Sequence, residues 1–150
     1  MFGKLPAHGD FVCRGVDGQV ERLLDSWLSQ WIAAERSRLG TEFEDVYRSA
    51  QPWLYCDNAS TAVLIPSADR AGRLFPLFVA TNKPVVVQRL YDLAVDAIGR
   101  GMPADSLYEN VGMLDGHSFE ETLAGVWFLP DKDHPSLADP GDFVPAEAGL

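Results

Sequence analysis

The densest group of side chains that could do chemistry lies in one short segment, residues 66–76. Asp69, Arg70 and Arg73 occur within five residues, and two prolines and a glycine restrict the backbone around them. Two guanidinium groups could bind an anion or an acidic partner, because each presents several N–H donors in a fixed geometry. Alternatively, Asp69 and Asp10 could satisfy the arginines in an internal network that locks the turn to the N-terminal loop, and we expect this role for at least one arginine. An unpaired, partly buried arginine would cost several kcal/mol, so the fold must either pair it or expose it.

The histidines form no metal-binding pattern. His8, His117 and His134 lie far apart in the chain, outside the spacings that ligate zinc. His8 beside Gly9-Asp10 could serve as a general base held by a carboxylate. Neighbours in sequence rarely point at each other, however, so a loop histidine that faces solvent is the simpler interpretation.

Other nucleophile and phosphate-binding patterns are missing from the sequence. Ser67 lacks the Gly-x-Ser-x-Gly setting that exposes a nucleophile. Lys4 follows a glycine but precedes a leucine and a proline, so it is not part of a phosphate-binding loop. Cys13 and Cys56 are too few and too far apart for a disulfide framework or a structural zinc site, and their apolar neighbours indicate buried free thiols. We therefore predict no catalytic residue, no metal and no cofactor.

The composition is that of one globular domain with an acidic surface. At 150 residues, 47% of them hydrophobic, the chain can bury about 70% of the surface that its unfolded form exposes. Its formal net charge of −10 argues against nucleic acid or a membrane surface as a partner. No apolar run approaches the roughly 20 residues that span a bilayer, and nothing at the N-terminus resembles a signal peptide. We therefore expect a cytoplasmic protein.

The strongest periodic pattern predicts a long amphipathic helix from Val16 to Leu39. Its apolar residues recur every three or four positions, as on one face of an α-helix. Asp17 suits the N-cap position, and Gly40 suits the C-terminal stop. Trp27 lies in the middle of the apolar face, where packing in the core is the expected role.

Shorter patterns complete an α+β fold with a mainly antiparallel sheet and helices on at least one face. We expect an edge strand near the N-terminus and further strands at 53–56, 61–65, 74–80 and 123–129. A capping box at Thr41 and Glu44 should precede a second helix, and further helices should occupy residues 87–98 and begin again at Pro103. Ser118 and Glu121 have the spacing of a second capping box. Residues 1–130 form the domain, and residues 131–150 form an acidic loop or tail of the same domain that contains proline and glycine. Phe143 and Val144 could anchor that tail.

Four blocks of the sequence carry a family resemblance. They are Gly3-Lys4-Leu5-Pro6 with Gly9-Asp10-Phe11, then Asp25-x-Trp27-Leu28, then Pro52-Trp53-x-Tyr55, and finally Pro66-Ser67-x-Asp69-Arg70-x-Gly72-Arg73-x-Phe75-Pro76-Leu77. Together they resemble the TagF family, also called ImpM, whose members are accessory proteins of the bacterial type VI secretion system. The blocks occur in the right order over roughly the first half of the chain, and the last is long enough to be specific. The sequence departs from the family at Leu24, where a tryptophan often precedes Asp25.

The resemblance implies a cytoplasmic regulator rather than an enzyme. It implies a post-translational repressor of type VI secretion that acts by protein–protein binding, alongside a threonine-phosphorylation switch. The implied partners are a forkhead-associated scaffold protein or other type VI secretion components, and the sequence gives no expectation for the oligomeric state. The site residues are then a charge network, either partner-binding or structural, of Lys4, Asp10, Asp69, Arg70 and Arg73.

Two alternatives come from other classes of protein. The first is a small enzyme that uses His8, Asp10 and the arginines on an anionic substrate such as a phosphoester. The second is a structural subunit of the secretion apparatus with no regulatory role.

Overall fold

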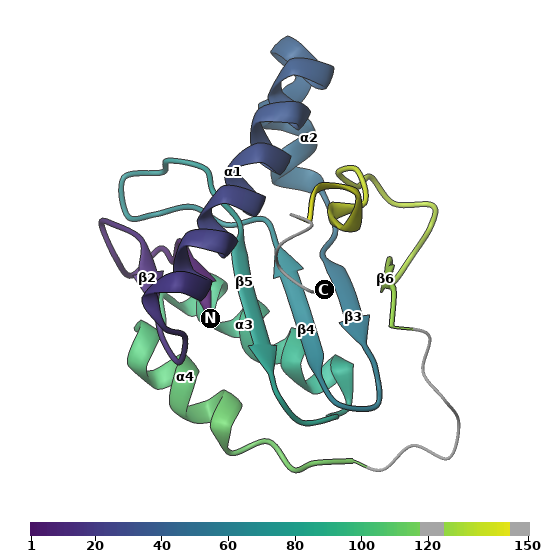
Figure 1. Ribbon diagram of the computed structural model, residues 1–150. Helices are drawn as coiled ribbons and strands as arrows, with labels where there is room; N and C mark the ends of the chain where they lie inside the picture. Colours follow the sequence, from purple (N-terminus) through teal and green to yellow (C-terminus); the bar gives the residue numbers. More distant parts are fainter. Residues whose placement is uncertain (118–124, 145–150) are drawn as a thin grey trace.

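An antiparallel sheet organises the part of the chain that this computed structural model describes, residues 1–117 and 125–144 (Figure 1). Within these residues, six strands pair in the order β2-β1-β5-β4-β3-β6, and every neighbouring pair is antiparallel. The strands are β1 (Phe2–Gly3), β2 (Val12–Cys13), β3 (Trp53–Cys56), β4 (Thr61–Ile65), β5 (Leu77–Thr81) and β6 (Trp127–Phe128). The predicted α+β fold with a mainly antiparallel sheet in a single domain is confirmed.

Helices cover both faces of the sheet. One face packs against α1 (Gly18–Leu39) and α2 (Phe43–Ser49), which the 3₁₀ turn η1 (Gly40–Glu42) connects, and the other packs against α3 (Val87–Arg100) and α4 (Ala104–Gly112). Figure 1 shows α1 crossing in front of the strands and α3 running behind them. A short 3₁₀ helix, η2 (Pro140–Phe143), contacts α1 near the C-terminal end of the described chain.

Alternating side chains of the central strands separate two hydrophobic cores. Val63 and Ile65 of β4, together with Leu77 and Val79 of β5, join the core formed with α3 and α4. Leu64, between the two β4 residues, joins the core formed with α1 and α2. Because successive side chains of a strand point to opposite faces and both faces are covered, β4 is buried along its whole length, and every residue after Thr61 is apolar.

The long helix α1 begins and ends close to the predicted residues. The carboxylate of Asp17 accepts the N–H of Val20 at 2.9 Å, which makes Asp17 the N-cap as predicted. Gly40 follows the last helical residue with φ +56, a conformation that glycine adopts at little cost. Trp27 is only 2% exposed and lies in the core.

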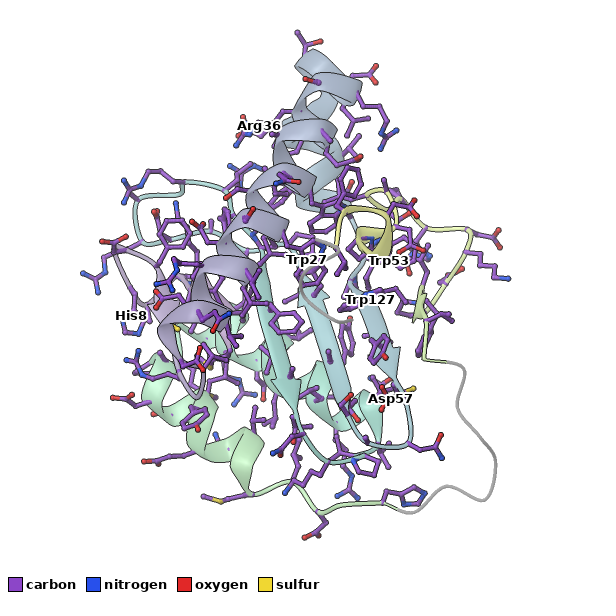
Figure 2. The ribbon with its side chains drawn as sticks, in the orientation of Figure 1. His8, Trp27, Arg36, Trp53, Asp57 and Trp127 are labelled. Atoms are coloured by element: carbon purple, nitrogen blue, oxygen red, sulfur yellow. The ribbon has the colours of Figure 1, made fainter. Side chains whose placement is uncertain are left out.

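Three tryptophans hold the segment that follows β6 against this helical layer. The indole N–H groups of Trp27, Trp31 and Trp53 donate to backbone carbonyls within residues 137–140, at 2.9, 2.9 and 3.1 Å. Figure 2 shows Trp27 and Trp53 beside η2. Phe143 and Val144 also pack against this core, while residues 145–150 lie outside the described part.

The capping box predicted at Thr41 and Glu44 does not form. Residues 40–42 are already a 3₁₀ turn that leads directly into α2, and the N-cap residue Glu42 has helical dihedrals with no side-chain cap. The N–H of Phe43 therefore bonds the carbonyl of Gly40, and Glu44 pairs with Arg48 at 2.9 Å instead. The second capping box, at Ser118 and Glu121, lies outside the described residues.

Two strand boundaries and the position of one strand in the sheet differ from the prediction. The strand expected from residue 74 starts at Leu77, because Pro76 has no N–H to continue the ladder. The N-terminal strand β1 is not an edge strand, since β2 pairs on its outer side. The strand expected at 123–129 is described only at Trp127–Phe128, and residues 118–124 lie outside the described part.

Candidate functional site

Residues 66–76 form the wide turn between β4 and β5. An isolated bridge between Ala68 and Leu74 narrows the turn halfway along. At its tip the N–H of Gly72 donates to the carbonyl of Asp69 at 3.0 Å, with φ +82 at the glycine. This geometry folds the charged residues of the turn back over their own backbone.

Asp69 is the centre of a charge network. Its buried side chain accepts the N–H groups of Ala71 and Arg73 on Oδ1, at 2.9 and 3.0 Å. Its Oδ2 accepts Nε of Arg73 at 2.7 Å and lies 3.2 Å from Nζ of Lys4. Burial alone would raise the pKa of Asp69, but hydrogen bonds from Arg73 and Lys4 outweigh it and lower the pKa to about 2. Asp69 therefore stays ionised at neutral pH.

The guanidinium groups of Arg70 and Arg73 tie the turn to the N-terminal loop. Nη2 of Arg73 donates to the carbonyl of Gly9 at 2.7 Å, and Nη2 of Arg70 donates to the carbonyl of Ala7. The backbone N–H of Arg70 also donates to the carbonyl of His8, at 2.7 Å. Both arginines remain exposed, with 64% of the Arg73 side chain accessible. Each arginine is thus held in place by the N-terminal loop and is still accessible to a partner.

Asp10 does not satisfy an arginine, which corrects the expectation from the sequence. Its carboxylate accepts the N–H of Phe11 at 2.7 Å, since a short acidic side chain readily bonds nearby backbone. Carbonyl groups of the loop take its place as acceptors for the arginines. His8 likewise has a different partner, because its Nε2 accepts the N–H of Ala104 at 3.0 Å, at the start of α4. Figure 2 places His8 at the side of the sheet remote from the labelled tryptophans.

A close backbone contact positions Lys4 against the turn. Gly3 has φ +136, and a Cβ atom there would lie 2.1 Å from the carbonyl oxygen of Pro76. The N–H of Lys4 donates to the same oxygen at 3.4 Å. Only glycine permits this approach, and it brings the 8% exposed Lys4 to Asp69.

Phe11 is a surface residue that sequence reasoning missed. Its ring is 45% exposed, stacks on Phe2 with centroids 5.7 Å apart, and meets Phe75 edge-on at 4.9 Å. Nζ of Lys4 lies 4.9 Å from the centre of the same ring. The Gly-Asp-Phe block contains this residue, but nothing in the sequence distinguishes an exposed phenylalanine from a core one.

Ser67 and Tyr47 also belong to the site, in structural positions. The Ser67 hydroxyl is buried and donates to the carbonyl of Lys4 at 2.7 Å. The hydroxyl of Tyr47, from α2, contacts both backbone groups of Ser67. Burial raises the pKa of Tyr47 well above its ordinary value, so this hydroxyl keeps its proton.

No cluster of three His, Cys, Asp or Glu side chains suited to a metal ion occurs among residues 1–117 and 125–144. In the same residues, no helix combines the length and apolar character needed to cross a membrane. Cys13 and Cys56 are free, half-buried cysteines, and burial raises the pKa of both thiols.

The residues of this network fall within a region that a known family shares. A family described as the TagF N-terminal domain, type VI secretion system-associated, matches residues 1–98. The chain belongs to this family. The TagF domain is therefore an accessory domain of the type VI secretion system, and the matched region includes the whole turn and the N-terminal loop.

The fold of the TagF domain also has a solved counterpart. The crystal structure of PA0076 from Pseudomonas aeruginosa PAO1 matches it with a TM-score of 0.66, covering 86% of this chain and 69% of that one. The two sequences are 24% identical, so this likeness concerns the fold alone. No curated protein matches the chain.

Proposed function

We propose that the TagF domain represses type VI secretion post-translationally by binding another protein of the system. The first candidate partner is a forkhead-associated scaffold protein. The observation that supports this proposal is a surface made of Phe11, Arg70 and Arg73, here called the turn surface, in which exposed side chains rest on a braced support. Arginine and aromatic side chains are the types that most often dominate the energetics of protein interfaces.

The chemistry of the turn surface favours an acidic partner segment. Each guanidinium group carries five N–H donors, and bonds within the chain use two of them in Arg73 and one in Arg70. The remaining donors suit carboxylate or phosphate oxygens. Because the arginines are already anchored, binding would restrict them less than it restricts free side chains. The chain as a whole has a net charge of −10 and repels acidic segments. The positive turn surface would therefore fix the orientation in which an acidic segment of the partner approaches.

We further propose that the domain acts without catalysis. His8 and Asp10 engage different backbone groups rather than each other, so they are not arranged as a base and its orienting acid. The hydroxyl of Ser67 is buried and engaged with the carbonyl of Lys4. These contacts support a binding role for the region over the hydrolysis of an anionic substrate.

The test is a pull-down with the full chain from a type VI-positive bacterium, followed by calorimetry with the purified partner. A forkhead-associated protein should be recovered, and Arg70→Ala should weaken its binding about tenfold or more. Arg89→Ala is the matched control, because Arg89 is an exposed arginine of α3 in the opposite helical layer. Expression of the chain should also lower secretion without lowering the amounts of the secretion components.

Other results would replace the proposal. Recovery of sheath or baseplate subunits without the scaffold protein would favour a structural subunit. Hydrolysis of generic phosphoesters that disappears in His8→Ala would favour an enzyme. Equal binding by Arg70→Ala and Arg89→Ala would remove the turn surface from the interface.

A further inference from the structure

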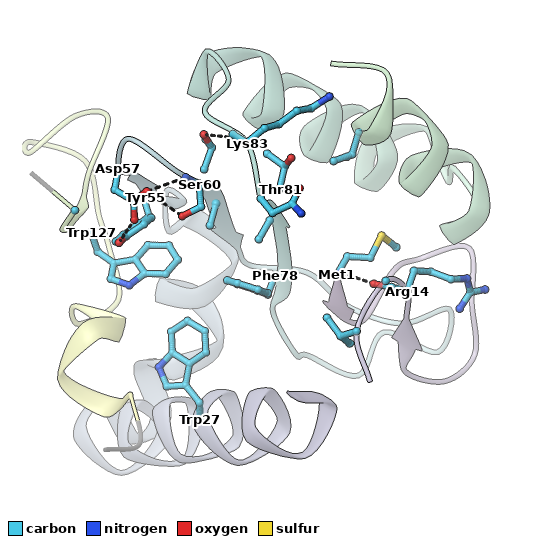
Figure 3. Close-up of a pocket in the computed structure, with 18 of the residues that line it drawn as sticks. Met1, Arg14, Trp27, Tyr55, Asp57, Ser60, Phe78, Thr81, Lys83 and Trp127 are labelled. Carbon is cyan, nitrogen blue, oxygen red and sulfur yellow. Dashed lines mark hydrogen bonds between the residues drawn. The ribbon is translucent and has the colours of Figure 1, made fainter. Parts of the chain in front are cut away.

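A cavity of about 960 Å³ lies on the α1 side of the sheet. It opens where strands β3, β4 and β5 extend beyond the cover of α1, and α4 and the segment around Trp127 border it. Figure 3 shows Trp127, Phe78 and Trp27 around one end of the cavity and Met1 and Arg14 at the other. None of the three residues of the turn surface lines it.

The cavity exists because side-chain size drops between two neighbouring rows of the sheet. In the first row, Trp53, Leu64, Phe78 and Phe2 lie opposite one another on β3, β4, β5 and β1. All four are large, and all four pack in the core beneath α1. These side chains pack between the sheet and the helix.

The second row lies two residues along each strand, and therefore on the same face. Here Trp127, Tyr55, Ala62 and Ala80 lie opposite one another on β6, β3, β4 and β5. The side chains of Trp127 and Tyr55 are as large as those of the first row, whereas Ala62 and Ala80 each carry only a methyl group. The result is a low apolar floor with an aromatic wall beside it.

Aromatic rings form most of the wall at this end. The Trp27 ring lies 5.9 Å from that of Trp127 and 5.5 Å from that of Phe78, and Tyr55 lies 5.4 Å from Trp127, all measured between centroids. The Trp27 indole N–H is engaged with a backbone carbonyl and Trp27 is only 2% exposed, so the half-buried rings of Tyr55, Phe78 and Trp127 supply the accessible part of the wall. Ring edges and faces of this kind attract other planar rings.

The charged residues along the wall are already engaged or face water. Asp57 accepts a tyrosine hydroxyl and two backbone N–H groups at 2.7 Å each, and Asp139 accepts a backbone N–H at 2.8 Å. Lys83 donates to a backbone carbonyl at 3.3 Å, and Arg14 pairs with an aspartate at 2.7 Å. Glu109 is exposed on α4. Hydrogen bonds or solvent thus already engage the charged groups of the described lining, including the N-terminal ammonium of Met1, which donates to the carbonyl of Arg14 at 2.7 Å.

We propose that this cavity is a binding site for a small, uncharged ligand with a planar ring system. The ring lies over the half-buried Ala80, beside Ala62, and against the aromatic wall, where it removes apolar surface from water. The volume falls within the range of about 300–1,000 Å³ typical of small-molecule sites. The described lining combines aromatic and alanine side chains with polar ones such as Ser60, Thr81 and Asn82, which could orient a ligand. The proposal is independent of the turn surface and assigns the TagF domain a second kind of binding site.

The test titrates the ¹⁵N-labelled chain with 2-naphthol, a neutral planar probe, and follows the four tryptophan indole N–H signals by NMR. The signals of Trp27 and Trp127 should shift and saturate, because both residues line the cavity. Those of Trp31 and Trp53 should stay in place, because neither residue lines it. The absence of a saturable shift, or equal shifts of all four signals, would overturn the proposal.

A variant that fills the floor separates the cavity from other modes of binding. Ala80→Leu should weaken 2-naphthol binding at least about tenfold, since its side chain would occupy the space above the floor. Ala33→Leu, on the exposed side of α1, is the matched control and should bind like the parent. Unchanged Trp31 and Trp53 signals show that Ala80→Leu is folded, and Ala80→Val is used if it is not. Parental affinity in a folded floor variant would also overturn the proposal.

Discussion

The hydroxyl of Tyr47 donates to the carbonyl of Ser67 at 2.8 Å and accepts the N–H of the same residue at 2.9 Å. One side chain from α2 thus satisfies the backbone of the turn as a neighbouring strand would. Both residues are buried, so neither backbone group could turn to water instead. Because Ser67 also bonds the carbonyl of Lys4, hydrogen bonds connect α2, the turn and the N-terminal loop in series.

Tyr47→Phe should lower the free energy of unfolding by about 1–3 kcal/mol, because it leaves the buried N–H of Ser67 without a partner. The carbonyl of Ser67 keeps the N–H of Phe75, at 3.2 Å. Denaturant unfolding followed by circular dichroism measures the change. Tyr108→Phe is the control, since Tyr108 is 46% exposed and its change should stay within about 0.5 kcal/mol. Equal stabilities of the two variants would mean that the Tyr47 hydroxyl contributes nothing to holding the turn.

The pKa of Asp69 predicts a specific acid sensitivity. Hydrogen bonds lower this pKa from its ordinary 3.8 to about 2, so the folded state binds the proton more weakly than the unfolded state. The stability that the ionised group contributes is therefore complete above about pH 4 and is lost as the pH falls toward 2. Asp69→Asn should be less stable than the parent at pH 7, and the difference should shrink across this range.

Unfolding measured at intervals between pH 7 and pH 2 tests this prediction. Asp45→Asn, at an exposed acid of α2, serves as the control and should follow the parent curve. A difference between parent and Asp69→Asn that stays constant down to pH 2 would show that Asp69 does not titrate as its contacts require.

Gly3→Ala should prevent folding or cost at least about 3 kcal/mol, because it combines a positive φ with a steric clash. The new Cβ would lie 2.1 Å from the carbonyl oxygen of Pro76, and φ at this position is +136. Gly9→Ala is the paired control, since a Cβ there would meet nothing within 4 Å. Soluble yield and denaturation midpoints of the two variants decide the matter, and a parental midpoint for Gly3→Ala would contradict the close approach of β1 to the turn.

The sequence predicts the elements whose signals are local. The period of α1 and the spacing of β3 and β4 are visible within each segment, because burial of one face fixes the pattern. Asp69 and Arg73 are four residues apart, so their contact also needs no knowledge of the rest of the fold. The start of β5 differs from the prediction because Pro76 has no backbone N–H to donate, whereas the apolar pattern of the segment was interpreted correctly.

The partners of the site are harder to predict because many of them are backbone groups. The sequence suggested Asp10 as the acceptor for the arginines, whereas the fold supplies the carbonyls of Ala7 and Gly9. Every residue has a carbonyl, so composition gives no sign of which ones will be used. The contact between Tyr47 and Ser67 joins residues 20 positions apart, and no local motif encodes it.

Trp27→Ala should destabilise the domain by about 3–5 kcal/mol, the usual cost of truncating a buried tryptophan. Trp27 is 2% exposed, and its indole N–H holds Pro140, so the variant loses both packing and a hydrogen bond. Val20→Ala, at a 39% exposed position of the same helix, is the control and should change stability by less than about 1 kcal/mol. A soluble Trp27→Ala chain that unfolds with the parent would move Trp27 out of the core and make it a candidate for partner binding.

Substitutions of Arg70 and Arg73 should have different effects on stability when stability and partner binding are measured on the same variants. Arg73 donates to the buried carboxylate of Asp69 and to the N-terminal loop, so Arg73→Ala should lower the denaturation midpoint as well as weaken binding. Arg70 reaches only a loop carbonyl with its side chain, so Arg70→Ala should keep a near-parental midpoint and still lose about tenfold in affinity. Arg70→Lys adds a sharper comparison: it keeps the charge but not the fork of donors, and it should recover little of the lost affinity if the partner is held by paired hydrogen bonds. Parental binding by Arg70→Ala and Arg73→Ala alike would make the arginines purely structural and place the partner on another face.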